Sequence, residues 1–260
     1  MKQGLPIPRK RYLLRRLLER LVSRIKGREY SFDQEIPLGP LVSVALRRLL
    51  WLVRGNLKSM LLRQRLCSVF VAPGVTWRNA RMIRFGHGIT LERGVIVDGL
   101  SRQGVEIGDD VLIGPYSVIR ASMLTRLGEG VRIGKRSAMD AYSYIGAGGG
   151  VFIGDSVIMG QHVSFHAENH QYDRLDVPIR EQGITRKGIV IEDDCWVGSN
   201  VTFLDGVRVG RGCVIAAGTI VRGEIPAYSV VAGVPGRVIK SRKEEAITPV
   251  SVAPSLVSGR

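Results

Sequence analysis

The chain has 260 residues, 45% of them hydrophobic and 6% aromatic, which suffices to bury a full core as one large domain or as one domain with an appendage. No apolar run approaches the ~18 residues that cross a bilayer, and residues 1–20 lack an apolar stretch followed by a small-residue cleavage site, so we expect neither a spanning helix nor a signal peptide. Three cysteines without framework spacing favour a reducing compartment over a disulfide-stapled fold, and cytoplasm is the expected location.

The formal charge of +15 belongs mostly to the N-terminal quarter. Residues 1–66 contain 16 Lys and Arg against 4 Asp and Glu, whereas the rest of the chain contains 22 against 19. A basic surface spread over the whole fold would indicate nucleic acid. This distribution does not, and we expect no nucleic-acid partner.

The same quarter predicts two basic amphipathic helices within residues 1–66. In the first, "RYLLRRLLERLVSRIKG", apolar side chains recur at helical spacing at Leu14, Leu17, Leu18, Leu21 and Ile25, and Gly27 offers a stop. In the second, residues 40–66, one line of the helical wheel carries Arg47, Arg54, Lys58 and Arg65, opposite a face of Leu, Val, Trp51 and Met60. Two interpretations stay open: the segment lies on an anionic membrane surface at the inner face of the membrane, or it covers the end of the following domain.

From about Val69 the sequence repeats with a period of six. In words such as "IGDDVL" and "IGKRSA" an aliphatic residue is followed by Gly, and a small or β-branched residue stands four places after the aliphatic one. The period predicts a chain that turns every six residues, with an aliphatic side chain at each corner of a triangular coil and the small residue just inside. Three hexads close a coil of 18 residues, whose faces stack as parallel strands ~4.8 Å apart. Cys195 and Cys213 occupy the small inward position, so we expect them in the core.

The interruptions of the repeat keep its phase. Ile119 to Ile133 spans 14 residues, Ile145 to Ile153 spans 8, and 165 to 191 spans 26, each a multiple of six plus two. The chain is therefore expected to leave a corner and to return to the same stack, whereas a sandwich of short strands would require a period-2 alternation that is absent. We predict a mainly β fold, a parallel β-helix over residues 67–240 with a loop at 166–188, and a flexible tail at 241–260.

Residues 107–240 resemble the left-handed parallel β-helix acetyltransferases of the hexapeptide-repeat superfamily, and within it the sugar and xenobiotic O-acetyltransferases. The resemblance rests on "IEDDCWVGSNVTFLDGVRVGRGCVIAAGTIVRGEIPAYSVVAGVPGRVIK" and on "HAENHQYDRLDVPIREQG" before it. It implies a homotrimer with active sites between adjacent subunits, and acetyl-coenzyme A as co-substrate without a required metal. The fold alone would also suit other chemistries.

The loop that breaks the repeat holds the expected catalytic base. Removing a proton from an attacking hydroxyl suits a neutral imidazole, and the resemblance places His170 in that role with His166 as second choice. A zinc site built from His162, His166 and His170 is disfavoured, because residues four apart in a β-coil point in different directions.

The resemblance also implies binding residues. Those expected to hold the coenzyme are Trp196, Gly198, Ser199, Ala217, Arg222, Arg237 and Lys240, with cations toward its phosphates. Gly223 stands where relatives often carry a Lys. Those expected to contact the acceptor are Asp140, Glu168, Asn169 and Tyr172, and Tyr142 or Tyr144 could stack on a sugar ring.

Taken together, these features predict an acetyl-coenzyme A-dependent O-acetyltransferase that acts on a sugar hydroxyl, in biosynthesis of a cell-surface polysaccharide, by direct transfer with a histidine base. The acceptor would be a sugar or glycan, including lipid-linked forms. Two alternatives stay open: a xenobiotic or amino-sugar N-acetyltransferase of the same fold, and a non-catalytic trimeric β-helix that scaffolds partners.

Overall fold

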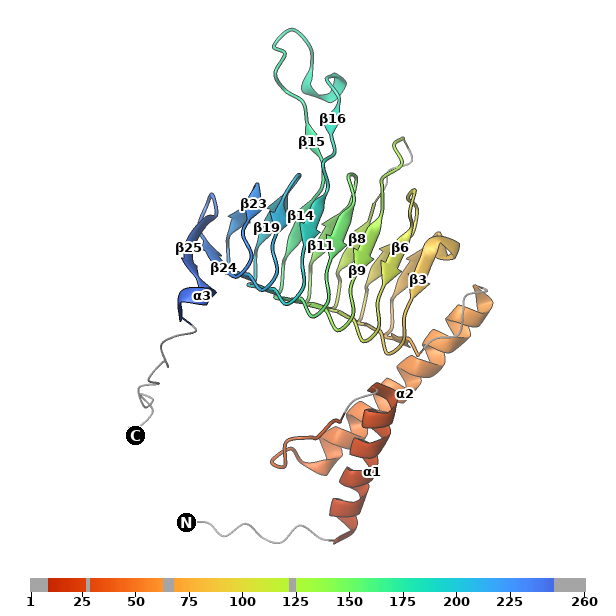
Figure 1. Cartoon of the computed structure of the whole chain (residues 1–260). Coiled ribbons are helices and arrows are strands. Elements are labelled where there is room, and N and C mark those ends of the chain that lie inside the picture. The colour runs from red at the N-terminus through yellow and green to blue at the C-terminus, as the bar shows by residue number, and fades with distance from the viewer. Residues whose placement is uncertain (1–8, 27–28, 63–67, 122–124, 246–260) are drawn as a thin grey trace, which may run out of the picture.

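Two helices precede a long coil of short parallel strands in the computed structural model, which describes residues 9–26, 29–62, 68–121 and 125–245 (Figure 1). Three of the four described sheets run along the coil, and each turn of the chain adds one strand to each of these three. The predicted parallel β-helix is therefore confirmed.

Sheet A follows the order β1-β4-β7-β10-β13-β18-β21-β24-β25, sheet B the order β2-β5-β8-β11-β14-β19-β22, and sheet C the order β3-β6-β9-β12-β17-β20-β23. The strands of sheet A are β1 Phe70–Val71, β4 Thr90–Leu91, β7 Leu112–Ile113, β10 Ala138–Met139, β13 Ile158–Met159, β18 Trp196–Val197, β21 Val214–Ile215, β24 Ser229–Ala232 and β25 Arg237–Ser241. Those of sheet B are β2 Thr76–Arg78, β5 Ile96–Asp98, β8 Val118–Arg120, β11 Tyr144–Gly146, β14 Ser164–His166, β19 Thr202–Leu204 and β22 Ile220–Val221. Those of sheet C are β3 Ile83–Phe85, β6 Val105–Ile107, β9 Val131–Ile133, β12 Val151–Ile153, β17 Ile189–Ile191, β20 Arg208–Val209 and β23 Glu224–Ile225.

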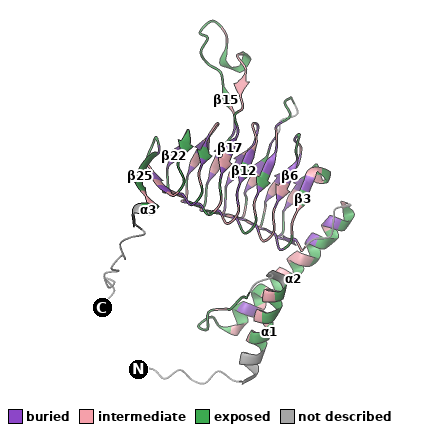
Figure 2. Cartoon of the chain, viewed as in Figure 1, coloured by how far each residue is buried: buried purple, intermediate pink, exposed green. Residues whose placement is uncertain are grey.

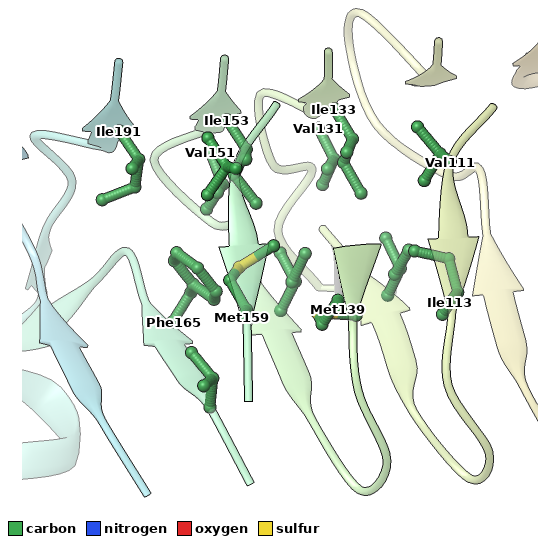
Figure 3. Packing of buried hydrophobic residues seen from close by; sticks show 14 of the residues in the cluster. Val111, Ile113, Val131, Ile133, Met139, Val151, Ile153, Met159, Phe165 and Ile191 are labelled. Carbon is green, nitrogen blue, oxygen red and sulfur yellow. The ribbon is translucent and has the colours of Figure 1, made fainter. Parts of the chain in front are cut away.

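Each hexad places its residues by one local rule. The aliphatic residue lies inside a strand and points into the coil, as Ile113, Ile133 and Met139 do (Figure 3). Three places later the backbone turns in the left-handed conformation, at Tyr116 and Tyr142 for example, and four places later the small residue is again buried. The corner itself is thus made by the residue at the third place, and the aliphatic side chain stands on the flat face before it.

The coil length also agrees with the repeat. The register partners Trp196 and Val214 of sheet A lie 18 residues apart, as do Thr202 and Ile220 of sheet B. Cys195 and Cys213 are buried in the shared core. The pKa of Cys195 is raised, first by the neighbouring Cys213 thiol and second by burial. Both cysteines are core residues, as expected from the repeat.

The three interruptions expected from the sequence all leave the coil at one corner, between sheet B and sheet C, which we call the B–C corner. They run from β8 to β9, from β11 to β12, and from β14 to β17. The longest, residues 167–188, is the excursion loop, which projects from the coil and carries the hairpin of β15 Asn169–His170 and β16 Ile184–Thr185 with the short 3-10 helix η2 Ile179–Glu181 (Figure 1). The opposite edge of sheet B, the A–B corner, turns tightly in every described coil.

The N-terminal helices form an arm at the first coil. Helix α1 Arg9–Lys26 lies beside α2 Leu38–Leu61, and α2 reaches the end of the coil at β1 (Figure 1). Side chains of α1 hold the connecting segment, because the Arg15 guanidinium donates to the carbonyls of Gln34 and Ile36. No helix in the described ranges is long and apolar enough to cross a membrane.

One face of α2 is fitted to the first coil. A Cβ on Gly55 would overlap the Val69 carbonyl oxygen, so only glycine allows this approach. The Arg54 guanidinium donates to the Val71 carbonyl at 3.1 Å, and Lys58 Nζ donates to the Val75 carbonyl at 2.7 Å. Burial lowers the pKa of Lys58. This part of the basic stripe therefore covers the end of the β-helix, and Arg65 lies outside the described residues.

The other face of α2 is apolar, and Figure 2 shows exposed residues along this helix. Between 52% and 73% of each residue is exposed along a stripe made of Leu46, Leu49, Leu50, Val53, Leu57, Met60 and Leu61, which we call the leucine face.

At the far end of the coil β24 pairs antiparallel with β25, and helix α3 Arg242–Glu245 follows β25. The short 3-10 helix η1 Ala80–Met82 lies near the other end, between β2 and β3. Most of the expected tail, residues 246–260, lies outside the described residues.

Candidate active site

A cavity of about 350 Å³ opens at the B–C corner, between the interruption after β8 and the excursion loop. Its lining joins both candidate bases to a group of polar side chains from four different coils and loops: Arg120, Arg126, Tyr144, His166, Glu168, His170, Arg180 and Arg186. The cavity exists because both interruptions leave the coil at the same corner.

Sheet B supplies the floor of the cavity through one row of register partners. Arg120, Gly146 and His166 are aligned on the adjacent strands β8, β11 and β14. Their outward positions follow from the alternation along each strand, since Ile119, Ile145 and Phe165 point inward. Gly146 contributes no side chain, and the Tyr144 ring fills part of the space above it, with its centroid 5.9 Å from that of His166.

His170 enters the cavity from the excursion loop. It lies on β15, opposite Ile184 of β16, and both His170 and His166 are exposed. Because the short hairpin positions His170 while the rigid coil positions His166, the two imidazoles reach one cavity from different supports. The structure brings together the two histidines that the sequence nominates.

An ion pair within the excursion loop is bound through Arg186 to the interruption after β8. Arg186 Nη2 and Nε donate to Glu168 Oε2 at 3.1 and 3.2 Å, and Arg186 Nη1 donates to the Leu127 carbonyl at 2.9 Å. A Cβ on Gly148 would overlap the Glu168 carboxylate, so glycine leaves the space that this pair occupies. Glu168, nominated as an acceptor contact, therefore has a positioning partner inside the cavity.

The other nominated acceptor residues lie elsewhere. Asp140 is at the A–B corner, where its carboxylate accepts a hydrogen bond from the Ala141 amide at 2.7 Å. Asn169 and Tyr172 are exposed on the excursion loop, outside the cavity lining. Tyr142 also lies at the A–B corner, stacked between Tyr116 and His162 with centroid distances of 5.4 and 5.2 Å.

The nominated coenzyme residues form two groups, and neither lies in the cavity. Trp196 is exposed on sheet A, and Gly198, Ser199 and Ala217 follow at the A–B corner, where Ser199 Oγ accepts a hydrogen bond from the Gln161 amide at 3.3 Å. Arg222, Arg237 and Lys240 are exposed near the C-terminal end of the coil. Within one chain, the width of sheet B separates Gly198, Ser199 and Ala217 from the two histidines.

Among the described residues, no group of three His, Cys, Asp or Glu side chains is placed to bind a metal ion. His162, one member of the disfavoured zinc set, is stacked on Tyr142 at the A–B corner, whereas His166 and His170 are at the B–C corner. What the cavity offers is imidazole next to carboxylate and guanidinium groups, an arrangement suited to general base catalysis on a polar acceptor.

Three of the four cavity arginines, Arg120, Arg126 and Arg186, are functional candidates that reasoning from the sequence missed. The signal was present in the phase of the repeat, because interruptions at 119–133 and 165–191 that leave the same corner must lie above one another. Arg120 and Arg126 belong to the first interruption or its edge, and Arg180 and Arg186 to the second.

A family model and two relatives that match this chain are all described as transferases. The model of the bacterial transferase hexapeptide (six repeats) matches residues 188–223. The candidate acetyltransferase Rv3034c of Mycobacterium tuberculosis H37Rv is 37% identical over 140 residues, which are 54% of this chain and 45% of that protein. The candidate lipopolysaccharide biosynthesis O-acetyl transferase WbbJ of Escherichia coli K12 is 32% identical over 168 residues, 65% of this chain and 76% of WbbJ.

The fold recurs among solved structures. The crystal structure of an acetyltransferase candidate from Bacillus cereus superposes with a TM-score of 0.50 at 18% identity, over 67% of this chain and 87% of that one. At this identity the likeness concerns the fold alone.

Proposed function

The chain belongs to the hexapeptide-repeat acetyltransferases of left-handed β-helix fold, and from this premise we propose that it transfers the acetyl group of acetyl-coenzyme A to a sugar hydroxyl in cell-surface polysaccharide biosynthesis. The observation that carries the proposal is the cavity in which His166 and His170 meet Glu168 and Tyr144. The name of WbbJ, an O-acetyl transferase candidate of lipopolysaccharide biosynthesis, supports the choice of a sugar hydroxyl.

The proposed reaction is direct transfer with His170 as general base. The neutral imidazole takes the proton of the acceptor hydroxyl while its oxygen attacks the thioester carbonyl carbon. The carbon–sulfur bond then breaks, the coenzyme leaves as the thiol after protonation, and the acetyl group stays on the sugar oxygen. The buried Cys195 and Cys213 are not available as a covalent relay, and no serine lines the cavity in the described residues.

We propose that the working site lies between copies of the chain. The histidines and the A–B group, which comprises Trp196, Gly198, Ser199 and Ala217, lie at opposite edges of sheet B, so one chain does not bring them to one point. A closed ring in which the excursion loop of one copy faces the A–B corner of the next would join them, and a homotrimer is the expected ring.

We also propose that the arm keeps the protein at the inner face of an anionic membrane. The leucine face offers apolar surface that the β-helix leaves uncovered, and exposed Arg20, Arg24 and Arg47 on the same two helices suit anionic head groups. A lipid-linked acceptor would then be held near the enzyme.

The decisive experiment measures release of free thiol from acetyl-coenzyme A with a panel of sugars, amino sugars and nucleotide-linked sugars. Sugar-dependent release with an O-acetyl product supports the proposal. Release only with amino sugars would assign N-acetyl transfer instead. No release with any acceptor, together with no binding of coenzyme A, would favour the non-catalytic scaffold.

A further inference from the structure

The cavity is strongly basic within a domain that is otherwise close to balanced. Its lining contains four arginines, Arg120, Arg126, Arg180 and Arg186, against a single carboxylate, Glu168. From residue 67 onward the whole chain carries 22 Lys and Arg against 19 Asp and Glu, so a random patch of its surface would contain nearly equal numbers of the two signs. The excess of positive charge is therefore local to this cavity.

The single carboxylate neutralises only one of these arginines. Glu168 accepts both of its guanidinium hydrogen bonds from Arg186, which is also tied to the Leu127 carbonyl. Arg186 is thus held in place as part of the wall. Three guanidinium groups remain around the same opening.

Arg120, Arg126 and Arg180 have no ion pair and no side-chain hydrogen bond among the described residues. The carboxylate nearest to Arg120 in the register of sheet B is Asp98, on the preceding strand. Asp98 is already used, because it accepts hydrogen bonds from Asn79 Nδ2 at 2.7 Å and from the Leu100 amide at 3.1 Å. Guanidinium groups of this kind are ready to bind an anion with two parallel hydrogen bonds.

The position along the coil assigns this charge to the acceptor. Arg120 lies two strands before His166 on sheet B, a separation of ~10 Å at the usual strand spacing. The residues expected to bind the coenzyme, Trp196 to Lys240, all lie on coils after His166. Arg120 and the coenzyme residues therefore lie on opposite sides of His166 along the coil, and the position between Arg120 and His166 is Gly146, above which the Tyr144 ring lies.

We propose that the acceptor is an anionic sugar, one that carries a carboxylate or a phosphate, and that Arg120, Arg126 and Arg180 bind its charged group while a hydroxyl is presented to the histidines. This inference rests on the proposed function for the identity of the acetylated group. Binding of the anion itself does not depend on acetyl transfer.

The test is direct binding to the intact protein, measured by calorimetry without acetyl-coenzyme A. Glucose, glucuronate and glucose 1-phosphate are compared, so that a neutral sugar stands beside a carboxylate and a phosphate of the same ring. We expect at least one of the two anions to bind about tenfold or more tightly than glucose, because hydrogen bonds to charged groups are the stronger ones. The preferred anion identifies which charged group the site takes.

Arg120→Gln is the test variant, and Arg208→Gln, exposed on sheet C and away from the cavity, is its matched control. Arg120→Gln should lower affinity for the preferred anion about tenfold and leave glucose and coenzyme A unchanged, whereas Arg208→Gln should change none of them. Equal affinities for the three sugars, absence of binding by both anions, or weakened coenzyme A binding in Arg120→Gln would each overturn the proposal. Anion binding without acetyl transfer would refute the proposed reaction and leave the anion site standing.

Discussion

The two edges of sheet B differ in how the chain turns, and the difference separates structure from chemistry. At the A–B corner every described turn is tight, and residues at equivalent positions stack on one another, as Tyr116, Tyr142 and His162 do with interplanar angles of 14° and 9°. At the B–C corner most coils carry extra residues, and the interruptions after β8, β11 and β14 enclose the cavity with both histidines. A regular corner presents a flat column of side chains, whereas an interrupted corner can surround a ligand.

The two edges of sheet B also differ in the contacts that hold their residues in place. Residues of the tight corner are held by the coil itself, because their backbone hydrogen bonds run to the coils on either side, as from Tyr142 to Pro115 and from His162 to Ala141. The excursion loop carries its own ion pair, between Arg186 and Glu168, and Arg186 also binds the Leu127 carbonyl of another interruption and not a strand of the coil. Changes at the interrupted corner should therefore alter activity more than stability.

The largest effect is expected for His170→Ala. Turnover should fall about 10²- to 10⁴-fold while the thermal midpoint and coenzyme affinity stay near those of the parent, since a general base is removed from an exposed hairpin and no core is opened. Steady-state kinetics with calorimetric unfolding measures both quantities. His87→Ala, another exposed histidine, serves as the control.

His166→Ala decides which support carries the base. If His170→Ala retains activity and His166→Ala loses it, the coil and not the excursion loop provides the proton acceptor. The contrast between the corners would then hold for substrate binding only.

The helical arm, which precedes the first coil, extends the comparison to a region outside the β-helix. Leu50→Asn together with Leu57→Asn should weaken binding to vesicles of anionic lipid by roughly ten- to a hundredfold, because apolar area on the leucine face no longer enters the interface. Cosedimentation at low salt measures the effect, and high salt should release the parent protein.

Leu175→Asn is the control for this pair, since Leu175 is fully exposed on the excursion loop and lies outside the arm. Unchanged vesicle binding in the double variant, or failure of the parent to bind vesicles at all, would contradict the membrane proposal. A change in oligomeric state would show instead that a second copy covers the leucine face.

A smaller effect is expected at the C-terminal end of the coil. Arg237→Ala should raise the apparent KM for acetyl-coenzyme A about tenfold and change kcat less, because a phosphate contact is remote from the reacting carbonyl. Initial rates over a range of coenzyme concentrations separate the two constants. Equal affinity for coenzyme A and its dephosphorylated analogue would argue against a 3′-phosphate contact.

The smallest change tests whether the two corners meet between copies. Coexpressed His170→Ala and Trp196→Ala chains should recover about a quarter of parental activity per assembly, because random mixing leaves about one interface in four with both halves intact. Each variant alone should be far less active. Absence of recovery in assemblies shown to contain both chains would place the whole site within one chain.

Much of the architecture was accessible from the sequence because each hexad is a local unit. Its inward aliphatic residue, its turn and its small residue are set within six positions, so the 18-residue coil and the phase of the interruptions could be predicted. Cys195 and Cys213 could be placed in the core for the same reason. His166 and His170 stood out through the resemblance and because they flank the point where the repeat stops.

Only the tertiary structure decided which residues surround those histidines. Leu127 and Arg186 are 59 residues apart and meet because two interruptions share one corner. Tyr144 lies in the cavity and Tyr142 at the opposite edge of the sheet, although both are tyrosines two positions apart. The basic stripe of α2 likewise turned toward the coil, since Gly55 permits close approach only on that side. Such neighbours depend on how coils and helices stack, and this stacking is a sum of many distant contacts that a local pattern does not encode.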